Sequence, residues 1–159
     1  MKNLILLFLL LPVLSYGQTL AQNETDAFTG ATVRKTFDTT FSEGLHCYGT
    51  YQKGKEDSTA TVAITLLYIP AGTTSINHGS DILLKLNNDE IVKVSNDAQY
   101  QASGSMVGLY FFLSKAQQEK LKSNSVKAIR IYTNDGYNDF NLSGTEQTFI
   151  PNICKLFAE

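Results

Sequence analysis

The stretch that decides the fold is Thr59-Ala60-Thr61-Val62-Ala63-Ile64-Thr65-Leu66-Leu67-Tyr68-Ile69. β-Branched and aromatic residues dominate it, which is typical of a β-strand. Apolar residues occupy both alternating sets of positions, so the pattern predicts a central strand covered on both faces. Pro70 ends the strand because proline cannot donate to a sheet ladder.

Further strand patterns flank this segment. Asp81–Leu86 and Glu90–Ser95 predict the two arms of a hairpin, with Ile82, Leu84 and Leu86 facing the core. Asn87-Asn88-Asp89 joins the arms, and these residue types favour turns. The remaining predicted strands are Val33–Phe37, Leu45–Gln52, Met106–Leu113 and Val126–Thr133.

Two segments change to a helical period. Ser114 has the chemistry of an N-cap with Gln117 as its capping-box partner, which predicts a helix that ends near Asn124. Apolar residues recur at three- and four-residue intervals from Phe149 to Phe157 and predict an amphipathic C-terminal helix, with Pro151 favouring a kink or a late start. The Asn/Asp/Gly-rich segment 134–144 is predicted to be a loop.

These patterns predict an α+β fold. It consists mainly of antiparallel or mixed β-sheet, with one short helix before the last strand and a C-terminal helix.

The N-terminus has the order of a secretory signal: Lys2, the apolar run Leu4–Leu14, then Ser15-Tyr16-Gly17. We therefore expect a signal peptide over residues 1–17 and a periplasmic or secreted mature protein without a membrane span. Polar residues 18–30 are interpreted as a flexible leader. Residues 31–159 then form a single globular domain.

The chain has two cysteines, Cys47 and Cys154. An oxidising compartment would favour a disulfide between them. Because cysteine also behaves as a small hydrophobe in cores, two buried thiols are an equal alternative. Sequence alone does not assign the pairing.

Charge and motifs exclude several function classes. Lys and Arg number 13 against 15 Asp and Glu, and the densest basic group, Lys53-Gly54-Lys55, is followed at once by acidic residues, so we expect no nucleic-acid partner. The glycine patterns that bind nucleotide phosphates are missing from the sequence, so no cofactor is expected.

The only histidines are His46 and His78, which leaves little for catalysis. His46 and Cys47 point to opposite faces of a strand and cannot pair with each other. His46, His78 and Asp81 lack the spacing of a metal site, so neither catalytic nor metal-binding residues are assigned. One alternative is a small hydrolase that uses His78 with Ser80 or Asp81.

Aromatic residues in loops are the best candidates for an exposed contact patch. Tyr100, Tyr137 and Phe140 lie in such segments, whereas most other Phe and Tyr lie in predicted strands. The favoured interpretation is a non-enzymatic binding domain for an unidentified protein or small ligand. A further alternative is an accessory or structural subunit of an envelope assembly.

The last third of the chain resembles a loose set of uncharacterised exported proteins of gram-negative bacteria. The residues that carry the resemblance are Leu113-Ser114, Gln117, Leu121, Ile129-Arg130-Ile131-Tyr132 and Asp135-Gly136-Tyr137, followed by a cysteine-bearing tail helix. The resemblance implies a strand–helix–strand unit with a helical tail and a location in the envelope. It implies no activity, cofactor or catalytic residue.

Overall fold

The computed structural model describes residues 19–42, 44–70, 74–98, 102–103 and 106–158. This part of the chain consists mainly of antiparallel β-sheet with two α-helices, which confirms the α+β prediction. The predicted signal peptide, residues 1–17, and Tyr100 lie outside the described residues. Among the described residues, no helix has the length and hydrophobicity needed to cross a membrane.

The larger of the two main sheets contains the segment that decides the fold. Its strand order is β1 (Leu20–Thr25), β2 (Thr32–Thr36), β4 (His46–Lys53), β5 (Thr61–Tyr68) and β10 (Val107–Phe112), with β3 (Thr39–Thr40) paired to β4. Strand β5 is central, as predicted. Its cover is one-sided, because Val62, Ile64, Leu66 and Tyr68 are buried whereas Ala63, Thr65 and Leu67 are only half-buried. The predicted double cover is therefore wrong.

The smaller sheet has the order β12 (Gly136–Asn141), β11 (Val126–Thr133), β7 (Asp81–Leu86) and β8 (Ile91–Ser95). Strands β7 and β8 form the predicted hairpin, and Ile82 and Leu84 are buried as expected. The short strands β6 (Ser75–Ile76) and β9 (Ala102–Ser103) form a separate pair.

Strand β12 corrects the predicted loop over residues 134–144. A two-residue connection, Asn134-Asp135, returns the chain so that Thr133 faces Gly136, whose φ of 136° favours glycine. The strand was missed because it lies at a sheet edge and buries only Phe140, so its sequence is almost entirely polar. The helix predicted before the last strand is therefore followed by two strands, β11 and β12.

Strand β1 corrects the predicted flexible leader over residues 18–30. Leu20–Thr25 pairs with β2 in antiparallel register, so the folded sheet begins before Ala31. Most of its side chains are exposed, and its place in the sheet comes from backbone pairing, which leaves no apolar pattern in the sequence.

Both predicted helices are present. Helix α1 (Lys115–Ser123) has Ser114 as N-cap and Gln117 in a complete capping box, and Asn124 is its C-cap. Helix α2 (Phe149–Leu156) follows the 3₁₀ turn η1 (Gly144–Thr148). Pro151 lies in the first turn of α2, where a backbone N–H has no partner within the helix, so the helix begins at Phe149 and the predicted late start is wrong.

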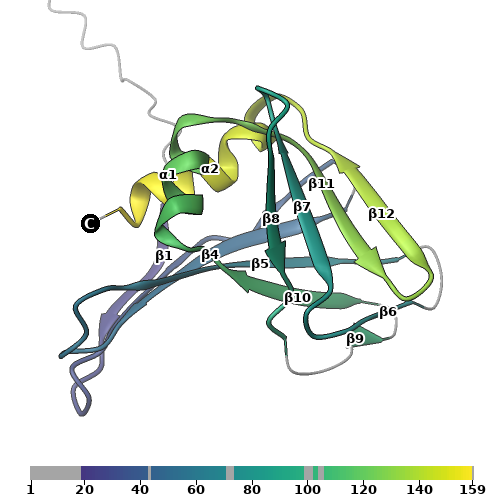
Figure 1. The fold of residues 1–159 in the computed structure, drawn as a ribbon. Helices are drawn as coiled ribbons and strands as arrows, with labels where there is room; N and C mark the ends of the chain where they lie inside the picture. The colour runs from purple at the N-terminus through teal and green to yellow at the C-terminus, as the bar shows by residue number, and fades with distance from the viewer. Residues whose placement is uncertain (1–18, 43, 71–73, 99–101, 104–105, 159) are drawn as a thin grey trace, which may run out of the picture.

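The core lies on one side of the larger sheet. Figure 1 shows α1, α2 and the smaller sheet on that side, and their buried apolar residues form a single cluster with those of β4, β5 and β10. Gly49 on β4 allows α2 to approach closely, because an added Cβ would meet the side chain of Ile153, with its Cδ1 only 3.1 Å away. No described element covers the opposite side of the larger sheet in this view.

Candidate functional site

The solvent side of the smaller sheet carries the exposed residue of the predicted contact patch, Tyr137. We call this surface the tyrosine face. It is formed by alternate side chains of four strands: Asp81, Leu83 and Lys85 of β7; Ile91, Lys93 and Ser95 of β8; Ala128, Arg130 and Tyr132 of β11; and Tyr137, Asp139 and Asn141 of β12. Most side chains at the intervening positions are buried in the core, because successive side chains of a strand point to opposite faces.

Tyr137 is exposed but held in place. Its side chain is 56% exposed, and the Arg130 guanidinium carbon lies 3.9 Å from its ring centroid. The ring of Tyr132, directly opposite in the register, packs edge-on at 6.1 Å between centroids. A cation over one ring face and a second ring at the edge fix the orientation of an exposed aromatic side chain.

Asp139 fixes Arg130 in turn. Nε and Nη2 of Arg130 each donate to a different carboxylate oxygen of Asp139, both at 2.6 Å. These bonds lower the pKa of Asp139 below its ordinary value and raise that of Arg130. The bidentate geometry aligns the guanidinium plane, so Asp139, Arg130 and Tyr137 form one ordered unit on the sheet.

A depression of about 330 Å³ lies beside this unit. Its lining includes the aliphatic side chains of Leu83, Ile91 and Ala128 together with Arg130 and Asp139. Ala128 stands between Asn141 and Lys85 in the register, and its short side chain leaves the hollow. The site thus combines a fixed aromatic ring, an apolar hollow and paired charges.

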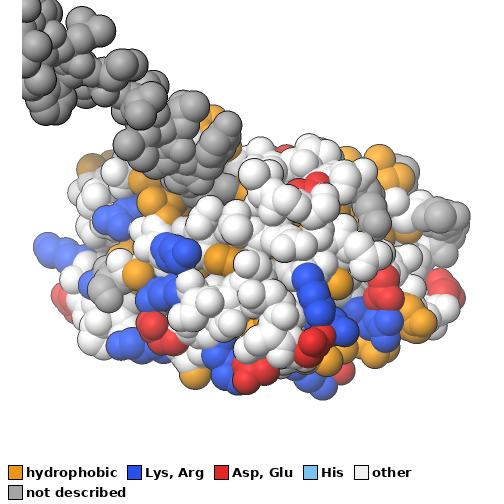
Figure 2. Space-filling view, turned by 90° about the horizontal axis from the view of Figure 1, so that it is seen from above, with side chains coloured by type: hydrophobic (Ala, Val, Ile, Leu, Met, Phe, Trp, Pro, Cys, Tyr) orange, Lys and Arg blue, Asp and Glu red, His pale blue; other side chains and the backbone are white. Residues whose placement is uncertain are grey.

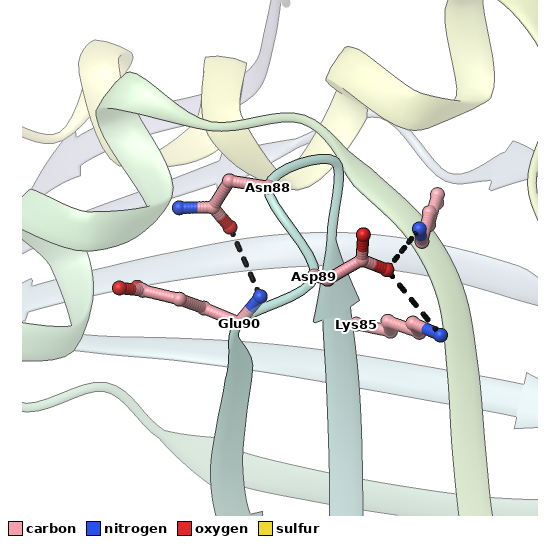
Figure 3. A network of polar contacts seen from close by, with 5 residues as sticks. Lys85, Asn88, Asp89 and Glu90 are labelled. Carbon is pink, nitrogen blue, oxygen red and sulfur yellow. Dashed lines mark hydrogen bonds and ion pairs between the residues drawn. The ribbon is translucent and has the colours of Figure 1, made fainter.

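The remaining charges around the tyrosine face are paired as well. Lys93 contacts Asp81 at 2.7 Å. At the β7–β8 turn, Asp89 binds Lys127 at 2.6 Å and Lys85 at 3.5 Å (Figure 3). The hydrogen bond from Lys127 is the largest cause of the lowered pKa of Asp89. The view from above, Figure 2, likewise shows positive and negative side chains interspersed.

The other members of the predicted contact patch differ from Tyr137. Phe140 is only 7% exposed, and its ring packs against that of Tyr68 at 5.3 Å, so its assignment to an exposed patch is wrong. Phe140 alternates with exposed neighbours on β12, which turns it to the core. Tyr100 lies outside the described residues.

The residues of the hydrolase alternative have other partners. Ser80 Oγ accepts a hydrogen bond from the backbone N–H of Asn77 at 3.2 Å, and the carboxylate of Asp81 pairs with Lys93. His78 is exposed. Among the described hydrogen bonds, none joins His78 to Ser80 or Asp81.

His46 has a partner that the sequence analysis missed. Its Nδ1 lies 3.1 Å from Asp38 Oδ2 and 3.2 Å from Thr40 Oγ1. Strand β3 pairs with β4 and brings this segment alongside His46. Because β3 is only two residues long, it leaves almost no pattern from which the contact could be predicted. His46 and Cys47 point to opposite faces of β4, as expected, and Cys47 is the buried one. The described residues contain no group of three His, Cys, Asp or Glu side chains able to hold a metal ion.

Cys47 and Cys154 are both buried and free. The structure therefore agrees with two buried thiols, one of the two alternatives for these cysteines. Burial raises the pKa of Cys47 well above its ordinary value and that of Cys154 to about 12. A thiol with a raised pKa is a poor nucleophile at neutral pH, so both cysteines serve as apolar core residues in this state.

No protein-family model, curated protein or solved structure matches this chain. The assignment of the tyrosine face as the candidate site therefore depends on its geometry.

Proposed function

We propose that this protein is an exported, non-enzymatic binding domain that takes a protein partner on the tyrosine face. The observation that carries the proposal is Tyr137, an exposed aromatic side chain that Arg130 and Tyr132 already hold in one orientation. Tyr and Arg are the residue types most enriched among interface residues that dominate binding energy. A side chain that is ordered before binding loses less entropy on association.

The hollow beside Tyr137 supports a protein partner. Its aliphatic lining suits one projecting apolar side chain, and the surrounding ion pairs present both signs of charge, as the rims of protein interfaces do. The hollow is open on a sheet surface, whereas small-molecule sites enclose most of their ligand.

Affinity capture from envelope extract tests this proposal, with the purified protein as bait. We expect a specific protein partner whose affinity falls at least roughly tenfold in Tyr137→Ala, because truncation of such anchors has effects of that size or larger. Phe112→Ala, an exposed aromatic on the other sheet, is the matched control and should retain the partner.

Two outcomes would contradict the proposal. A partner retained equally by Tyr137→Ala would place binding elsewhere on the molecule. Turnover of esterase, peptidase or glycosidase substrates by the purified protein, lost in His78→Ala, would favour the hydrolase alternative instead.

The export part of the proposal has its own test. The order of Lys2, Leu4–Leu14 and Ser15-Tyr16-Gly17 supports cleavage after residue 17. N-terminal sequencing of the protein recovered from the periplasm or medium should begin at Gln18. An intact N-terminus on protein retained in the cytoplasm would contradict export.

A further inference from the structure

The turn between β1 and β2 carries the most exposed large apolar side chain among the described residues. Phe28 is 99% exposed and lies in this turn. Figure 1 shows the turn projecting beyond the body of the molecule, at the lower left. A ring with this exposure makes almost no packing contact in its own chain, so it gains free energy only when a second molecule covers it.

Asp26 orders the turn that presents Phe28. One carboxylate oxygen of Asp26 accepts hydrogen bonds from the backbone N–H groups of Phe28 at 2.9 Å and Thr29 at 2.6 Å. The same oxygen accepts a bond from the Thr29 hydroxyl at 2.8 Å. The N–H of Gly30 donates to the Asp26 carbonyl, and the N–H of Asp26 donates to the Ala31 carbonyl, both at 2.8 Å. A side chain that an ordered turn presents loses less entropy on binding.

The neighbouring β4–β5 turn supports this one. A Cβ built on Gly30 would lie 2.9 Å from the side chain of Lys55, so Lys55 packs against the first turn. In the second turn the N–H of Gly54 donates to the Asp57 carboxylate at 2.9 Å. The two turns therefore form one projecting unit, which we call the tip and define as residues 26–31 and 53–58.

The hollow on the tyrosine face matches Phe28 in size and chemistry. Its volume is about 330 Å³, whereas an apolar cavity of about 150 Å³ already holds benzene. Leu83, Ile91 and Ala128 form its aliphatic lining. Arg130 lines it as well, and a guanidinium packs favourably on an aromatic ring. The hollow therefore has room and suitable partners for one phenyl ring.

The tip and the hollow have net charges of opposite sign. The tip has three carboxylates against two ammonium groups: Asp26, Glu56 and Asp57, and Lys53 and Lys55. The lining of the hollow has Lys85 and Arg130 against one carboxylate, Asp139. The tip thus has one excess negative charge and the lining one excess positive charge, which favours their approach.

The tip cannot reach the hollow of its own chain. In Figure 1 the tip lies at the lower left, whereas the smaller sheet lies on the right side of the molecule. A contact between them therefore joins two copies through two different surfaces, which is a heterologous interface. Each copy added in this way leaves one tip and one hollow unoccupied, so the contact repeats into chains unless a ring closes.

We propose that the protein partner of the tyrosine face is a second copy of this chain, whose Phe28 enters the hollow lined by Leu83, Ile91 and Ala128. This inference rests on the proposed function, because it uses the same face and names its partner. An ordered tip with an uncovered ring, a hollow of matching size and lining, and opposite net charges favour a second copy. Head-to-tail association also agrees with the alternative of a structural subunit in an envelope assembly.

Sedimentation velocity of the purified protein tests the association. We expect a weak equilibrium, with dissociation constants of roughly 10–100 µM, because one side chain and its surroundings bury less than a standard interface. Species larger than a dimer should appear as the concentration rises. Phe28→Ala should weaken the association at least roughly tenfold. Phe112→Ala removes an exposed aromatic side chain outside both sites and should associate like wild type.

A mixture of two variants distinguishes this contact from a symmetric dimer. Phe28→Ala keeps the hollow but lacks the ring, whereas Ala128→Phe fills the hollow with its own ring but keeps the tip. Each variant alone should be monomeric where wild type associates. Their equimolar mixture should form a 1:1 dimer and nothing larger, because only one tip and one hollow are functional. Circular dichroism and thermal unfolding must show that both are folded; Phe28 is exposed, and Ala128 lies in a strand, where an aromatic residue is favourable.

Three results would overturn the second copy as the partner. They are a wild-type monomer at roughly 500 µM, association of Phe28→Ala as strong as that of wild type, and a variant mixture that stays monomeric. Capture from envelope extract separates this inference from the proposed function. The captured protein should be the endogenous chain itself; a different protein that Tyr137→Ala loses would keep the tyrosine face as a binding site and exclude only the second copy.

Discussion

The solvent-facing surfaces of the two sheets differ in the number and pairing of their charged side chains. On the tyrosine face Arg130 pairs with Asp139, and Lys93 pairs with Asp81. On the solvent side of the larger sheet, β2 and β4 carry Lys35 and His46, and His46 is bonded to Asp38. A surface with paired charges stays hydrated without a partner and can bind through a few individual residues. A surface with few charges is stabilised when much of its apolar area is buried.

The two sides of the larger sheet differ in packing. Substitution of one glycine on each side, Gly49 and Gly108, measures this difference. Gly49→Ala should destabilise the protein by about 1–3 kcal/mol, because its Cβ would meet Ile153 and force α2 to move. In Gly108→Ala the nearest atom is Leu67 Cδ2 at 3.0 Å, the end of a flexible side chain on the solvent side of the larger sheet, so we expect less than about 0.5 kcal/mol.

Denaturant unfolding at low protein concentration measures both variants. Equal losses of unfolding free energy in Gly49→Ala and Gly108→Ala would contradict this difference, because they would mean that the solvent side of the larger sheet is packed as tightly as the core.

The paired charges of the tyrosine face predict a smaller, pH-dependent effect. Arg130 lowers the pKa of Asp139 in the folded protein, so the stabilisation is complete above the ordinary carboxyl pKa and is lost as the pH falls through the lowered value. Asp139→Asn should therefore be less stable than wild type at neutral pH, and the difference should disappear in acid. High salt should reduce it as well, because the pair is exposed.

Thermal unfolding of wild type and Asp139→Asn across acidic and neutral pH checks this expectation. Lys93→Gln provides a comparison, since it removes a different pair on the same face. A difference between wild type and Asp139→Asn that persists below the folded pKa would show that the effect is not electrostatic.

The smallest expected effect concerns the anchor itself. Tyr137→Phe keeps the aromatic ring beneath Arg130 and should change stability by less than about 0.5 kcal/mol, because the side chain is largely exposed. Partner capture by this variant distinguishes the ring from the hydroxyl. Retained capture would assign binding to the ring, whereas a loss as large as that of Tyr137→Ala would assign it to the hydroxyl.

Sequence analysis found the elements that have strong local signals. The central strand β5, the β7–β8 hairpin and the capping box of Ser114 and Gln117 are all present as predicted. It missed β1 and β12 because edge strands are held by backbone pairing and carry few apolar residues. It also placed Phe140 in an exposed patch, since the direction of a side chain depends on a strand that had not been recognised.

The candidate site was predictable only in part. Tyr137 was identified from its place in a polar segment, but Arg130, Asp139 and Tyr132 join it through the β11–β12 register. The link between His46 and Asp38 likewise depends on β3. Such contacts connect residues that share no local pattern.

The sequence by itself determined the α+β class, the central strand and both helix positions, because periodicity and capping act within a few residues along the chain. The tertiary structure decided which side of the larger sheet is covered, which aromatic side chains reach solvent and which charges are paired. These properties depend on strand order and register, and residues distant in the sequence set both.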